Sequence, residues 1–180
     1  MFKIVGGKVL LTIIAGAVFA SYAFGSKTAG EYIDDSTLAT KTKAALIEDQ
    51  LAPAGDLNVE VDKGVLQLSG FVDTKDKKAA ALAVANKIDG ATKVLDAIVV
   101  IPGSRTVGET VDDTTLHAKV KAALAKTSVG DAVAITIDVY KGEVLLAGFV
   151  DKLSIADSAG DAAEGISGVK KVHNYIAVGY

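Results

Sequence analysis

The stretch Lys-Gly-Val-Leu-Gln-Leu-Ser-Gly-Phe-Val-Asp at residues 63–73 returns at residues 141–151 as Lys-Gly-Glu-Val-Leu-Leu-Ala-Gly-Phe-Val-Asp. The same offset of 78 residues (141 minus 63) aligns residues 34–102 with 112–180 without a gap, and about 26 of roughly 69 aligned positions are identical. Agreement of this extent does not arise by chance. The sequence therefore predicts two copies of one module, at residues 34–102 and 112–180, joined by a linker at residues 103–111.

Each copy divides into the same elements when its apolar residues are followed along the chain. Leu57, Val59 and Val61 alternate with polar residues, as in a half-buried strand, and the glycine of Lys63-Gly64 suits a tight hairpin turn. A second strand around residues 66–72, an alanine-rich helix over 75–87 and a last apolar strand over 94–101 complete the first copy. The second copy repeats this order over residues 135–139, 144–150, 154–164 and 172–178.

A further helix precedes the strands of each copy. Its predicted start is Ser36 or Thr114, where a hydroxyl can cap free amides and neighbouring aspartates, Asp34-Asp35 and Asp112-Asp113, favour the positive helix end. Its leucines share one helix face, which must be buried against a neighbouring element. We therefore expect an α+β fold of two tandem helix-strand-strand-helix-strand modules, each a three-stranded mixed sheet with two helices on one face.

Glycine and phenylalanine recur at matching positions, and we predict that their roles are structural. The first glycine of each copy is expected in the hairpin turn, and the last is expected to end the second helix. The glycine before each phenylalanine is expected to let a helix approach the sheet, with the phenylalanine as the main aromatic side chain of the core. A ligand close to the backbone is the alternative at that glycine. The set comprises Gly64, Gly70, Phe71, Gly90, Gly142, Gly148, Phe149 and Gly168.

Residues 1–25 are typical of a secretory signal peptide. Lys3 and Lys8 form a positive segment ahead of an apolar core at residues 9–20, and small residues allow cleavage after Ala23 or Gly25. An uncleaved inner-membrane anchor is the alternative, because residues 4–24 are long enough to span a bilayer. We expect export to a bacterial periplasm in the first case and attachment to the inner membrane in the second.

The composition excludes several kinds of chemistry. Hydrophobic residues make up 50% of the chain but aromatic residues only 6%, so alanine, valine, isoleucine and leucine must build the core. The absence of cysteine excludes disulfides, thiolate nucleophiles and the acylated cysteine of a lipoprotein. A formal net charge of −3 argues against nucleic-acid backbones as the main partner.

Catalytic and cofactor motifs are also missing from the sequence. The two histidines, His117 and His173, occupy non-equivalent positions of the repeat, and no nucleophile or ligand cluster accompanies them. No glycine-rich phosphate loop occurs, and the Gly-x-x-Gly at Gly165 and Gly168 is not shared by the first copy, which has Lys87 in place of the first glycine. We predict a non-enzymatic protein with no catalytic residues, no cofactor, no metal and no nucleic-acid partner.

Each copy resembles the BON domain. The resemblance rests on the Lys-Gly hairpin, the strand ending Leu-x-Gly-Phe-Val, the alanine-rich helix and the closing Gly-x-x-Lys-Val at Gly90 and Gly168. Two such domains behind an export signal are similar to the osmotically inducible periplasmic proteins and the dual-domain outer-membrane lipoproteins of that family. The resemblance implies periplasmic residence, attachment to phospholipid surfaces or protein partners, a role in osmotic or envelope stress and, in one branch, chaperoning of exported proteins. Without cysteine, the chain departs from the lipoprotein branch.

Lysines on the first helix of each copy offer a surface for an anionic partner. They are Lys41, Lys43, Lys119, Lys121 and Lys126. An ordinary solvated helix face is the alternative, since exposed helical lysines are common. Near an anionic membrane each lysine could contribute on the order of 1 kcal/mol, which predicts weak and salt-sensitive association.

Two functions are consistent with these residues. The first is that of a peripheral envelope protein that binds anionic phospholipid or envelope proteins. The second is that of a periplasmic holdase-type chaperone, because cores rich in alanine and valine with few aromatic residues could expose apolar surface when loosened. The sequence leaves open the oligomeric state and the orientation of the two modules.

Overall fold

The computed structural model describes residues 29–48, 57–127 and 135–180, so the predicted signal segment at residues 1–25 lies outside the described residues. The first module consists of α1 (Ala29–Glu48), β1 (Leu57–Asp62), β2 (Val65–Val72), α2 (Lys75–Ala85) and β3 (Lys93–Val100). The second consists of α3 (Val107–Leu124), β4 (Ile135–Tyr140), β5 (Glu143–Val150), α4 (Leu153–Glu164) and β6 (Lys171–Val178). The predicted α+β order is confirmed. In the described ranges no helix combines the length and apolarity needed to cross a bilayer.

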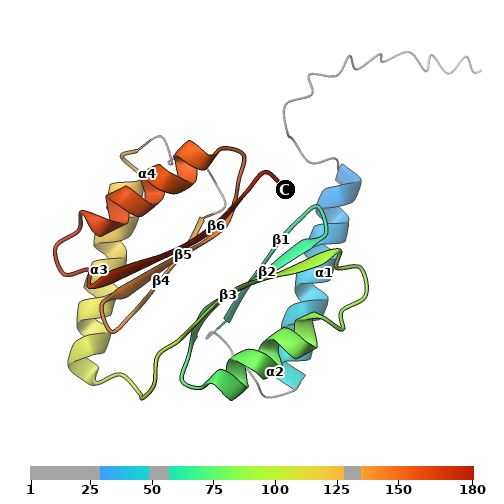
Figure 1. The fold of residues 1–180 in the computed structure, drawn as a ribbon, viewed down its shortest axis with the longest axis horizontal. Coiled ribbons are helices and arrows are strands. Elements are labelled where there is room, and N and C mark those ends of the chain that lie inside the picture. The colour runs from blue at the N-terminus through green and yellow to red at the C-terminus, as the bar shows by residue number, and fades with distance from the viewer. Residues whose placement is uncertain (1–28, 49–56, 128–134) are drawn as a thin grey trace, which may run out of the picture.

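The two sheets have the same mixed topology. Strand β1 pairs with β2 in antiparallel fashion through a hairpin, and β2 pairs with β3 in parallel, so the order is β1-β2-β3. The second sheet repeats this as β4-β5-β6. A parallel pair needs a crossover connection, which α2 and α4 supply. Figure 1 shows both helices of each module on one side of its sheet, as predicted.

The first helix of each module begins earlier than predicted. Helix α3 starts at Val107, and its N-cap is Thr106, whose hydroxyl accepts from the Glu109 amide at 3.2 Å while the Glu109 carboxylate accepts from the Thr106 amide at 2.8 Å. Thr114 lies inside this helix and donates its hydroxyl to the Thr110 carbonyl at 2.8 Å. The predicted starts at Ser36 and Thr114 are therefore wrong, and residues 107–111 of the predicted linker are helical.

The second helices end before the glycines predicted to end them. The C-cap of α2 is Asn86 and that of α4 is Gly165, both in right-handed conformation. Gly90 and Gly168 lie in the loops that follow, with φ of 102° and 105°. Only glycine adopts this backbone conformation without strain, so the two residues shape the loop and do not end the helix.

Each module has a hydrophobic core of its own between its helices and its sheet. In the first, Leu66 and Leu68 are fully buried and Ile98 is 1% exposed. In the second, Val144 and Leu146 take the equivalent places under α3 and α4. The two clusters share no residue, so neither core depends on side chains of the other module.

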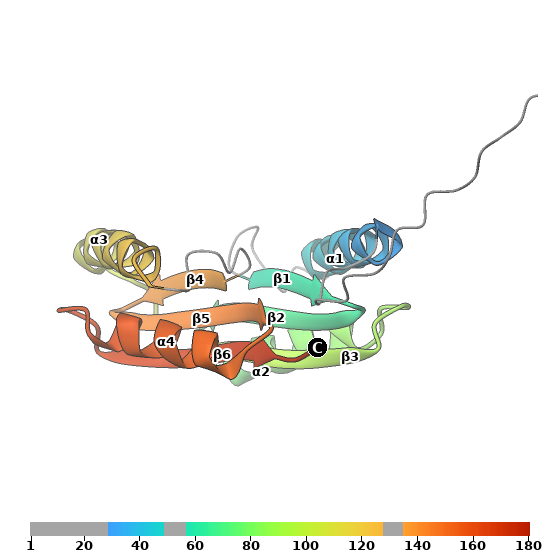
Figure 2. The ribbon, with the colours of Figure 1, turned by 90° about the horizontal axis from the view of Figure 1, so that it is seen from above.

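The sheet faces turned away from the helices pack on each other. Figures 1 and 2 show the resulting layers of helices, sheet, sheet and helices. Five side chains on these inner faces are almost fully buried although they lie outside both helix-side cores: Gln67, Ser69, Ala97, Leu145 and Ala147. The two modules therefore form one sandwich.

Phenylalanine belongs to this inner interface and not to the cores of the modules. Phe71 stacks on Tyr140 of the other module with ring centroids 5.5 Å apart, and Phe149 meets the edge of Tyr180 at 6.0 Å. Neither phenylalanine is in a core cluster. The prediction that they fill the cores is wrong because alternate residues of a strand face opposite sides of the sheet. Leu68 and Val72 point to the helices, so Phe71 points to the partner sheet.

Polar pairs join the outer strands β1 and β4 across the interface. The Asn58 amide donates to the Asp138 carboxylate at 2.6 Å, and the Thr136 hydroxyl donates to the Glu60 carboxylate at 2.7 Å. Asn58 and Thr136 are equivalent in the repeat, as are Glu60 and Asp138, so the two contacts are related by an approximate two-fold axis. Burial raises the pKa of Asp138 above its ordinary value, against the lowering effects of His117 and Asn58.

Candidate functional site

A buried aspartate on the first helix of each module holds the hairpin of that module. The Asp113 carboxylate is 3% exposed and accepts hydrogen bonds from the Lys141 and Gly142 amides, each at 2.8 Å. Asp35 accepts from the Lys63 amide at 3.0 Å and from the Gly64 amide at 2.8 Å. The prediction that these aspartates complement a helix start is wrong, since both lie well inside their helices and face the turn.

The hairpin needs this support because both of its turn residues have positive φ. The angles are 49° and 78° at Lys63 and Gly64, and 54° and 82° at Lys141 and Gly142. Such a turn aims two successive amides at one point, where a carboxylate satisfies both. An added Cβ at position 142 would also come within 3.1 Å of the Lys170 side chain, which would have to shift slightly.

A pocket lies beside the hairpin of each module. It is bounded by the first helix, the hairpin turn and the loop before the last strand of that module. The first has a volume of about 390 Å³ and the second about 240 Å³. Their linings match position by position at Asp34, Asp35, Thr37, Leu38, Lys41, Lys63, Gly64 and Gly90, which return as Asp112, Asp113, Thr115, Leu116, Lys119, Lys141, Gly142 and Gly168. Most of the repeated identities on the helix and the hairpin thus converge on one place in each module.

The two pockets differ in charge. Ser167 in the second pocket replaces Asp89 of the first, and Lys170 stands where the first copy has Thr92. Because Glu109 also lines the second pocket, its three acidic and three basic side chains balance, whereas the first pocket has three acidic and two basic side chains. The Lys170 ammonium donates to the Lys141 carbonyl at 2.8 Å, at the rim of the second pocket. The second pocket is therefore the better candidate for an anionic group.

Only part of the predicted lysine surface is assembled at these pockets. Lys41 and Lys119 line them, one in each module. Lys126 lies in the turn after α3, beyond the C-cap Ala125, and not on the helix as predicted. At 100° per residue, Lys43 and Lys121 fall on the opposite flank of the buried stripe from Lys41 and Lys119. Helices α1 and α3 lie in opposite outer layers of the sandwich (Figure 1), so the lysines do not form one patch.

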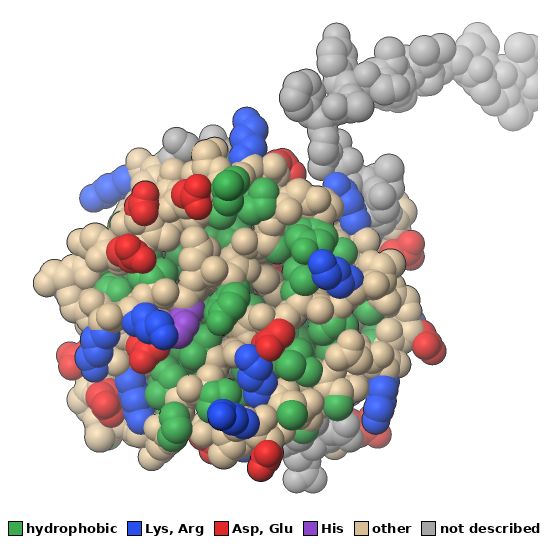
Figure 3. Space-filling view, viewed as in Figure 1, with side chains coloured by type: hydrophobic (Ala, Val, Ile, Leu, Met, Phe, Trp, Pro, Cys, Tyr) green, Lys and Arg blue, Asp and Glu red, His purple; other side chains and the backbone are tan. Residues whose placement is uncertain are grey.

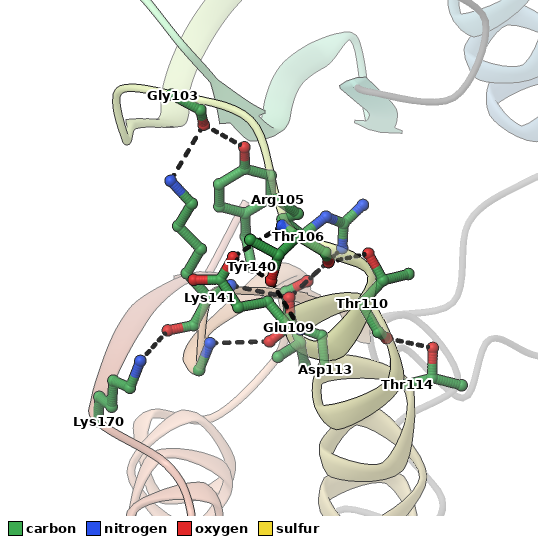
Figure 4. Close-up of polar contacts among 12 residues, drawn as sticks. Gly103, Arg105, Thr106, Glu109, Thr110, Asp113, Thr114, Tyr140, Lys141 and Lys170 are labelled. Carbon is green, nitrogen blue, oxygen red and sulfur yellow. Dashed lines mark hydrogen bonds and ion pairs between the residues drawn. The ribbon is translucent and has the colours of Figure 1, made fainter.

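A network that sequence reasoning missed fixes the linker to the second pocket (Figure 4). The Tyr140 hydroxyl donates to the Gly103 carbonyl at 2.7 Å, and the Lys141 ammonium donates to the Pro102 carbonyl at 3.0 Å. The Arg105 guanidinium lies 4.8 Å from the Tyr140 ring centroid and 3.5 Å from the Asp113 carboxylate. The linker and the hairpin of the second module therefore form one unit.

The neighbouring cap carries a perturbed carboxyl group. Hydrogen bonds from the Thr106 amide and hydroxyl lower the pKa of Glu109 below its ordinary value. The sequence signal that could have revealed this end of the helix is Thr106-x-x-Glu109, a capping-box pattern.

The histidines lie apart from the pockets. The His173 imidazole on β6 is 2.6 Å from the Glu143 carboxylate and makes an edge contact with the Phe71 ring, with centroids 6.3 Å apart, within the sheet interface. His117 is half-buried on α3. Within the described ranges, no group of histidine and acidic side chains is arranged to hold a metal ion. The contacts given above for the two histidines include no nucleophilic side chain with a base beside it.

Comparison with known proteins supports one family. A family model described as the BON domain matches residues 34–102 and 112–180. The chain is 32% identical over 146 residues to osmotically-inducible protein Y of Escherichia coli, covering 81% of this chain and 73% of that protein. It is 34% identical over 167 residues to the outer membrane lipoprotein DolP of Haemophilus influenzae, covering 92% and 86%. A solved C-terminal domain of CdsD from Chlamydia trachomatis overlaps 81% of this chain and 67% of its own, at 12% identity and a TM-score of 0.33, too low for any inference.

Proposed function

Because the chain belongs to the BON domain family, we propose that it is a non-enzymatic envelope protein that attaches peripherally to anionic phospholipid surfaces or envelope complexes during osmotic or envelope stress. The names of its relatives, an osmotically inducible protein and an outer membrane lipoprotein, support this placement. The proposal includes export to a periplasm.

One observation carries the membrane part of the proposal. The second pocket combines Lys119, an exposed lysine of α3, with Lys170 in place of the first copy's Thr92. Both lysines lie on the outer surface beside a hollow that can admit a headgroup. Their charge is local and exposed, so the attraction is expected to be weak and screened by salt.

Flotation with vesicles tests this proposal. Vesicles of anionic phospholipid are mixed with the protein over a salt series, and the variant Lys119→Gln/Lys170→Thr is compared with the matched variant Lys121→Gln/Lys152→Gln. Removal of two lysines at about 1 kcal/mol each predicts roughly 30-fold weaker association for the first variant. The matched variant loses the same charge away from the pocket and should bind nearly as the parent does. Equal losses in both variants, or no flotation of the parent at low salt, would remove the pocket from the explanation.

A holdase-type chaperone is the second candidate, and a specific observation favours it. The sheet interface buries an aromatic and aliphatic surface on each module, while each helix-side core is complete without it. Separation of the modules would thus expose apolar surface without unfolding either one. Suppression of the aggregation of an unfolded outer-membrane protein, without vesicles, is the measurement that distinguishes this candidate from the first.

A further inference from the structure

The inner face of the first module already binds polypeptide backbone. The side-chain amide of Gln67, only 2% exposed, accepts a hydrogen bond from the Gly148 amide at 2.6 Å and donates one to the Tyr175 carbonyl at 2.7 Å. A carboxamide can satisfy an N–H and a C=O of a peptide at once. The second copy has Leu145 at the equivalent position, so this backbone recognition belongs to the first module alone.

An aromatic platform lies next to Gln67 on the same face. Phe71 lies four residues after Gln67 on β2 and therefore on the same face of the sheet. It stacks on the Tyr140 ring with centroids 5.5 Å apart and makes an edge contact with the His173 ring at 6.3 Å. Offset stacking of this kind accepts aromatic side chains in general, because the contact uses only the ring faces. Backbone pairing and ring stacking together make a surface suited to an extended peptide with aromatic residues.

The sandwich is closed differently at its two ends. At one end the linker joins the two modules through the chain, and Tyr140 and Lys141 hold it further by hydrogen bonds to residues 102–103. At the other end, marked C in Figure 1, the Tyr180 carbonyl accepts from the Lys63 ammonium at 2.8 Å and the Tyr180 hydroxyl meets the Lys93 ammonium at 2.9 Å. Both contacts are exposed, as are the hydrogen bonds of the linker, so water competes for all of them, and only the linker end is also joined by the chain itself.

The interface also contains groups that oppose its closure. The Ser69 hydroxyl is fully buried there without a hydrogen-bond partner among the described residues. The Asp138 carboxylate is buried enough for its pKa to rise, which means that the ionised form is disfavoured in the closed state. On the face drawn in Figure 3, apolar side chains reach the surface between the two modules, among charged ones. The modules are thus in contact but are not sealed together.

We propose that the sandwich opens at its Tyr180 end about the linker, and that the inner face of the first module then binds an extended, aromatic-containing segment of an unfolded polypeptide. In the closed form, the second module covers this surface and therefore competes with the polypeptide segment for it. The separate cores keep both modules folded during the opening. The inference rests on the chaperone candidate for the function, and it identifies the surface and the kind of partner.

A covalent bridge at the open end tests the inference. The chain has no cysteine, so the variant Lys93→Cys/Tyr180→Cys can be joined specifically with a short bis-maleimide. Neither substitution changes Gln67 or Phe71. The control is the same variant capped on both cysteines with N-ethylmaleimide, which carries similar chemistry but no bridge.

Each form is assayed for suppression of the aggregation of a urea-unfolded outer-membrane β-barrel protein. The capped form should suppress aggregation, and the bridged form should need about tenfold more protein or fail, because its binding-competent state is removed. Equal suppression by both forms overturns the inference and leaves the chaperone function standing. No suppression by either form removes the chaperone function, and the inference with it.

A direct measurement makes the test independent of aggregation. An extended peptide with alternating aromatic residues is titrated into the isotopically labelled parent protein, and amide chemical shifts are followed. Perturbations are expected on β2 around Gln67 and Phe71 and on the Tyr180 end of the second module. Perturbations confined to the outer helices would overturn the inference.

Discussion

Replacement of the buried aspartate that holds a hairpin should destabilise the protein far more than replacement of the aspartate beside it. Asp113→Ala leaves the Lys141 and Gly142 amides without their shared acceptor, whereas Asp112→Ala alters an exposed side chain. The two residues are neighbours in one helix and carry the same charge. A role in complementing the helix dipole would make their costs similar, so the pair separates the two explanations.

The magnitude follows from the hydrogen bonds that are lost. Two bonds to a charged acceptor contribute about 1.5–3 kcal/mol each, and burial of the carboxylate offsets part of this sum, which gives an expected loss of about 2–4 kcal/mol for Asp113→Ala. Asp112→Ala should cost less than about 0.5 kcal/mol, as for a surface site. Asp113→Asn keeps the shape and one acceptor but sets an NH₂ group against an amide donor, so an intermediate loss is expected.

Equilibrium unfolding in urea, followed by far-ultraviolet circular dichroism, measures these differences. The slope of the unfolding free energy with urea should stay constant, so that a shifted midpoint reports stability alone. Asp35→Ala and Asp34→Ala repeat the comparison in the first module. The explanation that Asp113 holds the hairpin is refuted if Asp112→Ala costs as much as Asp113→Ala, or if Asp113→Ala costs less than about 1 kcal/mol.

Three single features of the structure lead to further predictions. Thr106→Ala should cost about 1 kcal/mol in thermal or urea unfolding because it removes the helix cap, while Thr114→Ala should change little; the reverse order would restore Thr114 as the cap. Gly148→Ala should destabilise by about 1–3 kcal/mol, since φ is 121° there; a neutral effect in the same assay would contradict a backbone requirement for glycine. Asp138 has a raised pKa in the folded state, so the folded form binds the proton more tightly and stability falls as pH rises from the ordinary carboxyl range through the raised value. Asp138→Asn should therefore gain stability relative to the parent over this rise in pH, and a pH-independent difference between the two would count against the buried charge.

Much of the fold could be predicted because each strand and second helix carries its own periodic signal. The alternation of Leu57, Val59 and Val61 and the Lys63-Gly64 turn placed the first hairpin correctly. The first helices were placed too late because the leucine stripe marks a buried face and not an end. The cap itself was readable, since Ser-Lys-Thr-Ala-Gly-Glu at residues 26–31 returns as Ser-Arg-Thr-Val-Gly-Glu at 104–109, at the offset of the repeat.

The candidate site was predictable only in part. The repeated lysines and glycines of the pockets stood out as identities, but their neighbours in space are far apart in the chain. Asp113 meets the hairpin across a separation of 28 and 29 residues. Nothing in the spacing of Asp112-Asp113 tells which carboxylate faces a turn and which faces water, because this depends on how the helix is rotated against the sheet.

The sequence by itself determined the module, its duplication and the family. The strand positions that face the helices are often the same residue in both copies, as they fill equivalent cores: Val61, Leu68, Gly70, Val72, Val94, Ile98 and Val100. On the other face of the strands, only Phe71 and Lys93 are shared. A repeat signal depends on identity, so this second face carried almost none.

Only the tertiary structure decided that the two sheets pack on each other and that Gln67, Asn58 and Phe71 belong to the interface. These contacts join different residues of the two copies, separated by 81 and 80 residues for the hydrogen bonds of Gln67 to Gly148 and Asn58 to Asp138. The physical reason is that complementary surfaces must differ: an amide needs a backbone group, and a buried carboxylate needs a donor. Complementarity of this kind leaves no periodicity in either copy and becomes visible only when both are folded.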